Sequence, residues 1–224
     1  MKTTAILLGT AALVASAGLA NAGTITTVGH NKAPHHFAHN PTNRALKTLY
    51  DQTSNDSGIG IVSQNFESTF AAYDAAAADD FTVGKKWKVS EVDANGVYFN
   101  GYGPATSEDV TFYSSKKNKP SKVVAQFLNV SGTDDGFGSF VITLPKKGVK
   151  LTKGTYWVSV VANCSFTGGC GEWGWENQTT SEGTAAQWQN PGGGFGVCPK
   201  WDDENVCIPD GQGDHMFALK GKGK

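Results

Sequence analysis

The stretch that decides the fold is Gly154–Gly196, GTYWVSVVANCSFTGGCGEWGWENQTTSEGTAAQWQNPGGGFG. It opens with the alternating pattern Thr155–Val161, which is typical of a half-buried strand. Two further aromatic segments, Glu172–Glu176 and Ala185–Trp188, also have the character of strands. Four of the six tryptophans lie here, so we expect this stretch to form either the core or the working face.

Shorter strand patterns flank this stretch at roughly ten-residue spacing, separated by Gly, Pro, Asn and Asp. No alternation of strands with helices is present that would build a parallel sheet. The sequence therefore predicts an all-β fold, an antiparallel β-sandwich of the jelly-roll type, whose first and last elements pair to protect the sheet edges. The flanking patterns are Ile59–Phe66, Asp79–Val83, Trp87–Tyr98 with a break at Asn95-Gly96, Asp109–Ser114, Val123–Leu128, Phe140–Leu144 and His215–Leu219.

The chain begins with one lysine and an apolar run that ends at Ala20-Asn21-Ala22. This order is typical of a secretory signal peptide over residues 1–22. A membrane anchor is the alternative, but the run is short for a spanning helix and is interrupted by glycine and hydroxyl residues. We expect cleavage after Ala22, export to the extracellular space or periplasm, and no membrane insertion afterwards.

Residues 23–43 are polar, contain four of the five histidines, and have the character of a flexible leader. The sequence Asn40-Pro41-Thr42-Asn43 then offers helix caps, which predict a short helix over Arg44–Tyr50. The remaining length, 44–222, suits a single β-sandwich domain. The chain ends at Gly221-Lys222-Gly223-Lys224 without a sorting tail, so covalent anchoring is not expected.

The whole chain carries 19 Lys and Arg against 20 Asp and Glu, and removal of the signal takes one lysine, giving 18 − 20 = −2. This near-neutral balance gives no global reason to expect nucleic acid or an acidic membrane as partner. The lysine cluster Lys116–Lys122 is interpreted as the solvated tip of a hairpin.

The cysteine count is four, all in the mature part, which in an exported chain favours disulfides over a metal or a catalytic thiol. Three pairings are possible. We prefer Cys164–Cys170 and Cys198–Cys207 because each closes a short loop that contains Gly or Pro.

Catalytic patterns are weak. There is no G-x-S-x-G, and His215 is the one histidine outside the leader, at a strand start where a turn role is favoured. Glu172 and Glu176 share a strand face about 13 Å apart, too far for a direct acid and nucleophile pair. The sequence assigns no catalytic residue, and a secreted glycan-directed hydrolase with dispersed carboxylates is the alternative function.

Two acidic pairs, Asp79-Asp80 and Asp134-Asp135, are oxygen-rich enough to hold a structural calcium ion. The ligand spacing of an EF-hand is absent, and turns capped by aspartates are the competing interpretation. No other cofactor is predicted.

The tryptophans remain as candidate ligand-binding residues. By strand alternation Trp173 and Trp175 share a face, which is either core or an outward platform that could stack on sugar rings or a partner protein. Neighbouring amides would supply directional hydrogen bonds. The candidate ligand-binding set is Trp173, Trp175, Asn177, Trp188, Gln189 and Trp201, with Gln178 and Gln187 nearby.

The glycine-rich loop Asn190–Gly196 lacks the Lys-Ser/Thr ending and the following helix of a phosphate loop. Its glycines are expected to permit positive φ and close backbone approach. Phe195 is its one apolar side chain, and we expect it to be buried against Trp157 or Trp188.

Five short segments carry a resemblance to a known family: Leu49–Gln52, Ser63–Glu67, Ala77–Val83, Gly154–Val160 and Trp188–Gly196. As a set they resemble a family of exported bacterial β-sandwich domains without an assigned activity, over about Leu46 to Leu219. The resemblance implies a jelly-roll-like sandwich outside the cytoplasm and brings no catalytic residue. We therefore expect a non-catalytic binding or structural module, glycan-binding through exposed aromatics, whose partner is a polysaccharide or another surface protein.

Overall fold

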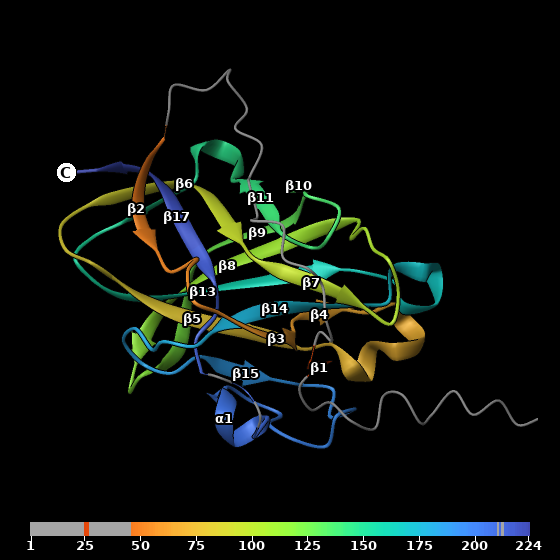
Figure 1. Cartoon of the computed structure of the whole chain (residues 1–224). Coiled ribbons are helices and arrows are strands. Elements are labelled where there is room, and N and C mark those ends of the chain that lie inside the picture. The colour runs from red at the N-terminus through yellow and green to blue at the C-terminus, as the bar shows by residue number, and fades with distance from the viewer. Residues whose placement is uncertain (1–24, 27–45, 210, 212) are drawn as a thin grey trace, which may run out of the picture.

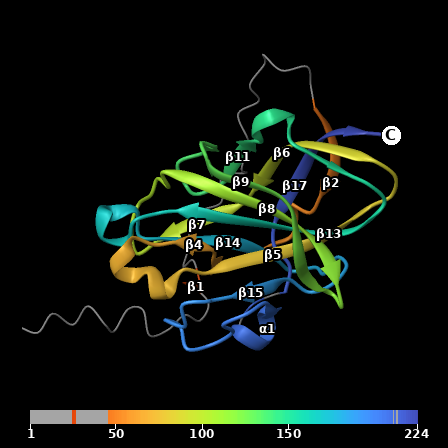
Figure 2. The same cartoon turned by 180° about the vertical axis from the view of Figure 1, so that it is seen from behind.

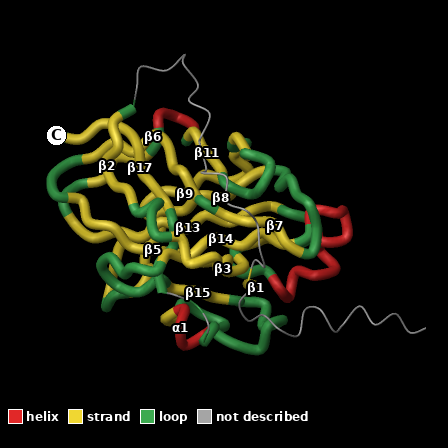
Figure 3. Tube along the Cα trace, in the orientation of Figure 1, coloured by secondary structure: helices red, strands yellow, loops and turns green. Residues whose placement is uncertain are grey.

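The computed structural model describes residues 25–26, 46–209, 211 and 213–224, shown in colour in Figure 1. The predicted signal peptide, most of the predicted leader and Arg44 lie outside these residues. Strands dominate the described chain, and the few short helical segments are the red pieces in Figure 3. The helical segments are η1 (Ser68–Tyr73), η2 (Pro145–Lys147), η3 (Phe166–Cys170) and α1 (Glu204–Cys207).

One layer of the fold is a seven-stranded sheet with the order β16-β15-β5-β13-β8-β9, in which β4 also pairs with β13. Figure 2 shows β5, β8 and β13 of this sheet on the near side. All its pairs are antiparallel except β13 with β4. Its strands are β4 (Gln64–Asn65), β5 (Ala76–Val83), β8 (Ser107–Lys116), β9 (Lys119–Val130), β13 (Gly154–Asn163), β15 (Gln187–Gln189) and β16 (Asp202–Asp203).

Two further antiparallel sheets complete the sandwich. A six-stranded sheet has the order β10-β11-β6-β17-β2, with β12 paired to β6, and a four-stranded sheet has the order β1-β3-β14-β7. The strands of the first are β2 (Lys47–Asp51), β6 (Trp87–Ala94), β10 (Thr133–Asp134), β11 (Phe140–Thr143), β12 (Val149–Leu151) and β17 (Phe217–Gly223). Those of the second are β1 (Ile25–Thr26), β3 (Asp56–Val62), β7 (Gly96–Phe99) and β14 (Glu172–Gln178).

The apolar core lies between the seven-stranded sheet and the other two. Phe81 of β5 stacks on Trp87 of β6 at 6.1 Å and meets Phe217 of β17 edge-on at 6.4 Å. Trp188 of β15 reaches across to β3, where its indole N–H donates to the Val62 carbonyl at 2.8 Å. The all-β antiparallel sandwich predicted from the sequence is confirmed.

The predicted helix over Arg44–Tyr50 is wrong, because the described part of this segment forms strand β2. Tyr50 pairs with Leu219 of β17, and its ring packs on Phe217 at 5.3 Å. The helix caps are a local signal, and burial of Tyr50 together with sheet pairing outweighs it. The predicted pairing of the closing strand with the first element of the domain is confirmed.

The predicted break at Asn95-Gly96 is also confirmed, and it has a topological role. β6 ends at Ala94 in the six-stranded sheet, and β7 begins at Gly96 in the four-stranded sheet. The lysine-rich tip is confirmed as well, since β8 ends at Lys116 and β9 begins at Lys119. Among the described residues, no helix is long and apolar enough to cross a membrane.

Candidate functional site

Most of the tryptophans predicted as ligand-binding lie in the core. Trp173, Trp175 and Trp188 have no exposed surface, and neither does Asn177. The indole N–H of Trp173 donates to the Gly138 carbonyl at 2.7 Å, so the polar atom is satisfied inside the protein. Of the two alternatives that the sequence left open for Trp173 and Trp175, the core is therefore the correct one. These side chains do not form an outward platform.

Two residues of the predicted set lie nearer the surface. Trp201 and Gln189 are half-buried, and Trp201 meets Tyr113 edge-on at 5.8 Å. Beside Trp201, Lys119 at the start of β9 contacts Asp202 of β16 at 2.5 Å. The two edge strands of the seven-stranded sheet are thereby joined, and Trp201 helps to hold that closure.

The glycine-rich loop also has a packing role. Phe195 is half-buried, against Tyr73 at 5.1 Å and Trp188 at 5.8 Å, so it packs on the Trp188 side and is less buried than expected. A Cβ on Gly192 would lie 2.6 Å from the Ala72 carbonyl oxygen, which explains why the loop needs glycine there.

The four aspartates predicted as calcium ligands act as hydrogen-bond acceptors. Asp79 accepts from Gln52 and from the His215 amide, each at 2.7 Å, and Asp80 accepts from the Thr184 amide at 2.7 Å. Asp134 and Asp135 accept backbone amides of a separate loop. Within the described ranges, no three His, Cys, Asp or Glu side chains converge as metal ligands would.

His215 is placed at the centre of a buried polar cluster. Its ring stacks on Trp175 at 4.5 Å, and Nε2 lies 2.8 Å from Glu204 Oε2, with both side chains fully buried. The two atoms lie within contact distance but do not form a well-aligned hydrogen bond. His215 thereby connects Glu204 of α1 to Trp175 of β14.

Both predicted disulfides are present, Cys164–Cys170 and Cys198–Cys207, each with 5.7 Å between the Cα atoms. Disulfides persist in oxidising compartments, so they indicate a non-reducing environment for this chain.

The exposed aromatic side chains are ones that the sequence analysis did not select. Among the described residues, the large hydrophobic side chains that remain exposed include two aromatics, Tyr102 at 93% and Phe137 at 70%. Tyr102 lies in the loop after β7, and Phe137 lies in the loop between β10 and β11. Both loops contact one residue of β7, Tyr98.

Tyr98 joins the two loops through its hydroxyl group. The hydroxyl donates to Asp134 Oδ2 at 2.6 Å and accepts from the Ala105 amide at 2.8 Å. Burial, together with the bond to Asp134, raises the pKa of Tyr98, so the hydroxyl keeps its proton at neutral pH. One side chain thus contacts Asp134, at the end of β10 just before the Phe137 loop, and Ala105 of the Tyr102 loop.

The Phe137 loop is held from within as well. Asp134 Oδ1 accepts the Gly136 amide at 2.7 Å, and Asp135 Oδ1 accepts the Phe137 amide at 2.8 Å and the Ser139 amide at 3.1 Å. These are the Asx-type bonds that stabilise a tight turn. The backbone that carries the Phe137 ring is therefore fixed while the ring itself projects into solvent.

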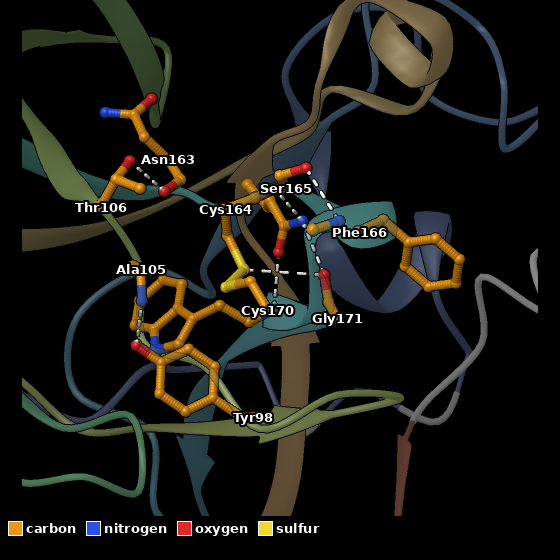
Figure 4. Close-up of a disulfide and its surroundings, with 12 residues drawn as sticks. Tyr98, Ala105, Thr106, Asn163, Cys164, Ser165, Phe166, Cys170 and Gly171 are labelled. Carbon is orange, nitrogen blue, oxygen red and sulfur yellow. Dashed lines mark hydrogen bonds between the residues drawn. A yellow bond between two sulfur atoms is a disulfide. The ribbon is translucent and has the colours of Figure 1, made fainter.

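The Tyr102 loop is attached to the Cys164–Cys170 disulfide loop. The Tyr102 amide donates to the Gly169 carbonyl, and the Gly103 amide donates to the Cys170 carbonyl, both at 3.1 Å. The backbones approach so closely that a Cβ on Gly101 would lie 2.4 Å from the Gly171 nitrogen. Figure 4 shows the Tyr98 hydroxyl bonded to the Ala105 amide beside this disulfide.

Polar groups accompany the two rings. Asn100 Nδ2 donates to Glu172 Oε2 at 2.7 Å, and Glu172 is only 3% exposed. Burial raises the pKa of Glu172 to about 7, against the opposing effect of the Asn100 bond. We define the aromatic loop site as Tyr98, Asn100, Tyr102, Asp134 and Phe137, with Glu172 hydrogen-bonded to Asn100.

A sequence signal for this site exists, although it is faint. Both aromatics stand alone among glycines in turn-forming segments, Asn100-Gly101-Tyr102-Gly103 and Gly136-Phe137-Gly138. An aromatic side chain between glycines has no neighbours to bury it, which favours exposure.

Comparisons of the chain with protein-family models, with curated proteins and with solved structures gave no match.

Proposed function

We propose that this protein is a secreted, non-catalytic binding module of the cell envelope or extracellular space, and that it binds glycan at the aromatic loop site. One observation carries the proposal. Tyr102 and Phe137 are 93% and 70% exposed, yet each lies on a loop whose backbone is fixed by hydrogen bonds. Rigid loops that present apolar side chains to water are a common form of binding surface.

The chemistry of the site suits a sugar. A sugar ring has apolar C–H faces and hydroxyl edges, so it needs a flat apolar partner together with directional hydrogen bonds. Tyr102 and Phe137 supply the rings, while Asn100 and Asp134 supply an amide and a carboxylate. Because the loops are already ordered by Tyr98, binding would not have to compensate for the entropy of ordering them.

Secretion is supported by the signal-like N-terminus together with the two disulfides. Disulfide pairs of this kind are rare where glutathione and thioredoxin keep thiols reduced. The proposed setting is therefore the periplasm or the extracellular space, where polysaccharides are abundant ligands.

The test is a glycan screen of the mature chain, followed by calorimetric titration of the best ligand. Tyr102→Ala and Phe137→Ala should each weaken binding by about fivefold, since a stacked ring contributes roughly 1 kcal/mol. Val206→Ala is the matched control, because Val206 is 69% exposed and lies on α1. Undiminished affinity in the Tyr102→Ala/Phe137→Ala double variant would refute the site.

A glycan-directed hydrolase is the second candidate, and the raised pKa of Glu172 favours it. A carboxyl group with a pKa of about 7 is partly protonated at neutral pH, as a general acid must be. The same screen can include chromogenic glycoside substrates. Turnover that is abolished by Glu172→Gln would establish the hydrolase and remove the non-catalytic proposal.

A further inference from the structure

Lysines gather at the end of the sandwich opposite the aromatic loop site. They come from the turn before β6 and the start of β6, from η2, from β12 and the turn after it, from the start of β2, and from the C-terminal end of β17 with the residue that follows it. Nine are exposed and Lys88 is half-buried. We call this set the basic end: Lys47, Lys85, Lys86, Lys88, Lys146, Lys147, Lys150, Lys153, Lys222 and Lys224.

Sheet register places three of these lysines abreast. Lys88 of β6 pairs with Lys150 of β12 on one side and with Lys222 of β17 on the other. Paired strands lie about 4.8 Å apart, so the two outer backbones of this row are about 10 Å apart. The amide of Lys224 donates to the Lys86 carbonyl at 3.0 Å, which adds two more lysines beside the row.

The positive charge of the basic end is not compensated by the described protein. The segments 84–90, 143–153 and 221–224 contain no acidic residue. The acids further along β6, Glu91 and Asp93, are engaged by Lys220 at 3.2 and 2.5 Å. The lysines that form ion pairs within the described part of the chain are Lys119 and Lys220, and neither belongs to the basic end.

Such an arrangement of lysines destabilises the folded protein when no ligand is bound. Like charges directly opposite each other on neighbouring strands are destabilising. Lys146 and Lys147 also adopt left-handed backbone conformations, with φ of 52° and 68°, which are uncommon for residues other than glycine. A ligand of opposite charge would relieve the electrostatic cost, which is a physical reason to look for one.

We propose that the basic end binds an acidic polysaccharide, through its carboxylate or sulfate groups. This inference does not depend on the aromatic loop site. Figure 1 shows the C-terminal end of β17 and the C-terminal end of β7 at opposite sides of the molecule. The segment Trp87–Phe99, which contains β6 and β7, would span at most about 40 Å at 3.3 Å per residue.

The composition of the surface favours a polysaccharide over the other polyanions. Nucleic-acid sites usually add exposed aromatics for base stacking, whereas Trp87 here is half-buried and stacked on Phe81. Stable binding to a lipid surface usually combines a basic patch with an apolar anchor, and the exposed large hydrophobics of the described residues lie outside the segments of the basic end. Lysine is a point charge on a flexible stem, which suits the irregular charge spacing of a flexible polymer.

The test is binding of the mature chain to polygalacturonate and dextran sulfate, with neutral dextran as the uncharged probe, at several salt concentrations. Lys88→Gln/Lys150→Gln/Lys222→Gln removes the row. A hairpin variant, Lys116→Gln/Lys117→Gln/Lys122→Gln, removes the same number of charges from another place. Thermal unfolding checks that both variants fold.

We expect both acidic polymers to bind more weakly as salt rises, and the row variant to bind at least about tenfold more weakly than the hairpin variant. Equal loss in the two variants would mean that only net charge matters, and would overturn the proposal. So would no binding to either acidic polymer, or stronger binding of single-stranded DNA or anionic vesicles than of the polysaccharides.

Discussion

The hydroxyl group of Tyr98 is the most informative single perturbation, because it joins both loops of the aromatic loop site. Tyr98→Phe keeps the ring and removes two hydrogen bonds, to Asp134 at 2.6 Å and from the Ala105 amide at 2.8 Å. A bond to a charged group contributes about 1.5–3 kcal/mol and a neutral one about 1 kcal/mol. Because Tyr98 and Asp134 are half-buried and water can partly replace both bonds, we expect a loss of about 2 kcal/mol.

The assay is equilibrium unfolding in guanidinium chloride, with thermal unfolding alongside. For a domain of this size, 2 kcal/mol corresponds to a fall in Tm of about 4–8 °C. A double-mutant cycle with Asp134→Asn isolates the Tyr98–Asp134 term, for which we expect a coupling of about 1 kcal/mol or more.

The matched control is Tyr156→Phe, since the Tyr156 hydroxyl makes a single exposed contact of 3.3 Å with Thr152. That variant should stay within about 0.5 kcal/mol of the parent protein. If Tyr98→Phe is as stable as Tyr156→Phe, or if the coupling with Asp134 is zero, Tyr98 does not organise the two loops.

Three further predictions follow from the buried acids, the second disulfide and the glycine-rich loop. Burial raises the pKa of Glu172 and Glu108 to about 7, so the folded state binds more protons than the unfolded state between about pH 4.5 and 7. Stability should therefore fall as pH rises through that window, and Glu172→Gln should reduce the fall in a pH series of unfolding midpoints; a flat series would contradict it. Cys207→Ser opens the Cys198–Cys207 loop and should cost about 2–3 kcal/mol of stability relative to the oxidised parent protein, by the loop-entropy relation, whereas under reducing conditions the variant and the parent should unfold at the same midpoint. Phe195→Ala should cost about 2 kcal/mol, less than the 3–5 kcal/mol of a fully buried ring, because Phe195 is half-exposed; an unchanged midpoint would show the loop to be free.

The sequence was sufficient for the fold class because strand alternation is a local signal. Val158 and Val160 alternate with Trp157 and Ser159 along β13, and this pattern needs no knowledge of the partner strands. Short cysteine spacing likewise limited the geometry of the disulfides. The helix expected near Arg44 failed because the caps are local, whereas the pairing of Tyr50 with Leu219 spans most of the chain.

Function was harder to predict because exposure is decided by packing between distant segments. Trp173 and Trp175 had the right residue type for a binding platform, but β14 lies between β3 and β7 and points both rings into the core. The loops that carry Tyr102 and Phe137 are far apart in the sequence, and both are hydrogen-bonded to or beside Tyr98. The row of Lys88, Lys150 and Lys222 is created by strand register. It could not be predicted from the total charge of the chain, which is near neutral.

The central claim, that glycan binds at the aromatic loop site, is tested most directly by chemical-shift mapping. Isotope-labelled mature protein would be titrated with the oligosaccharide that the screen selects, and amide and aromatic resonances followed. The claim predicts shifts concentrated in residues 98–106 and 134–139, with the Tyr102 and Phe137 ring signals moving most. Shifts confined to other surfaces, such as the exposed Val123 and Leu128 of β9, would contradict it.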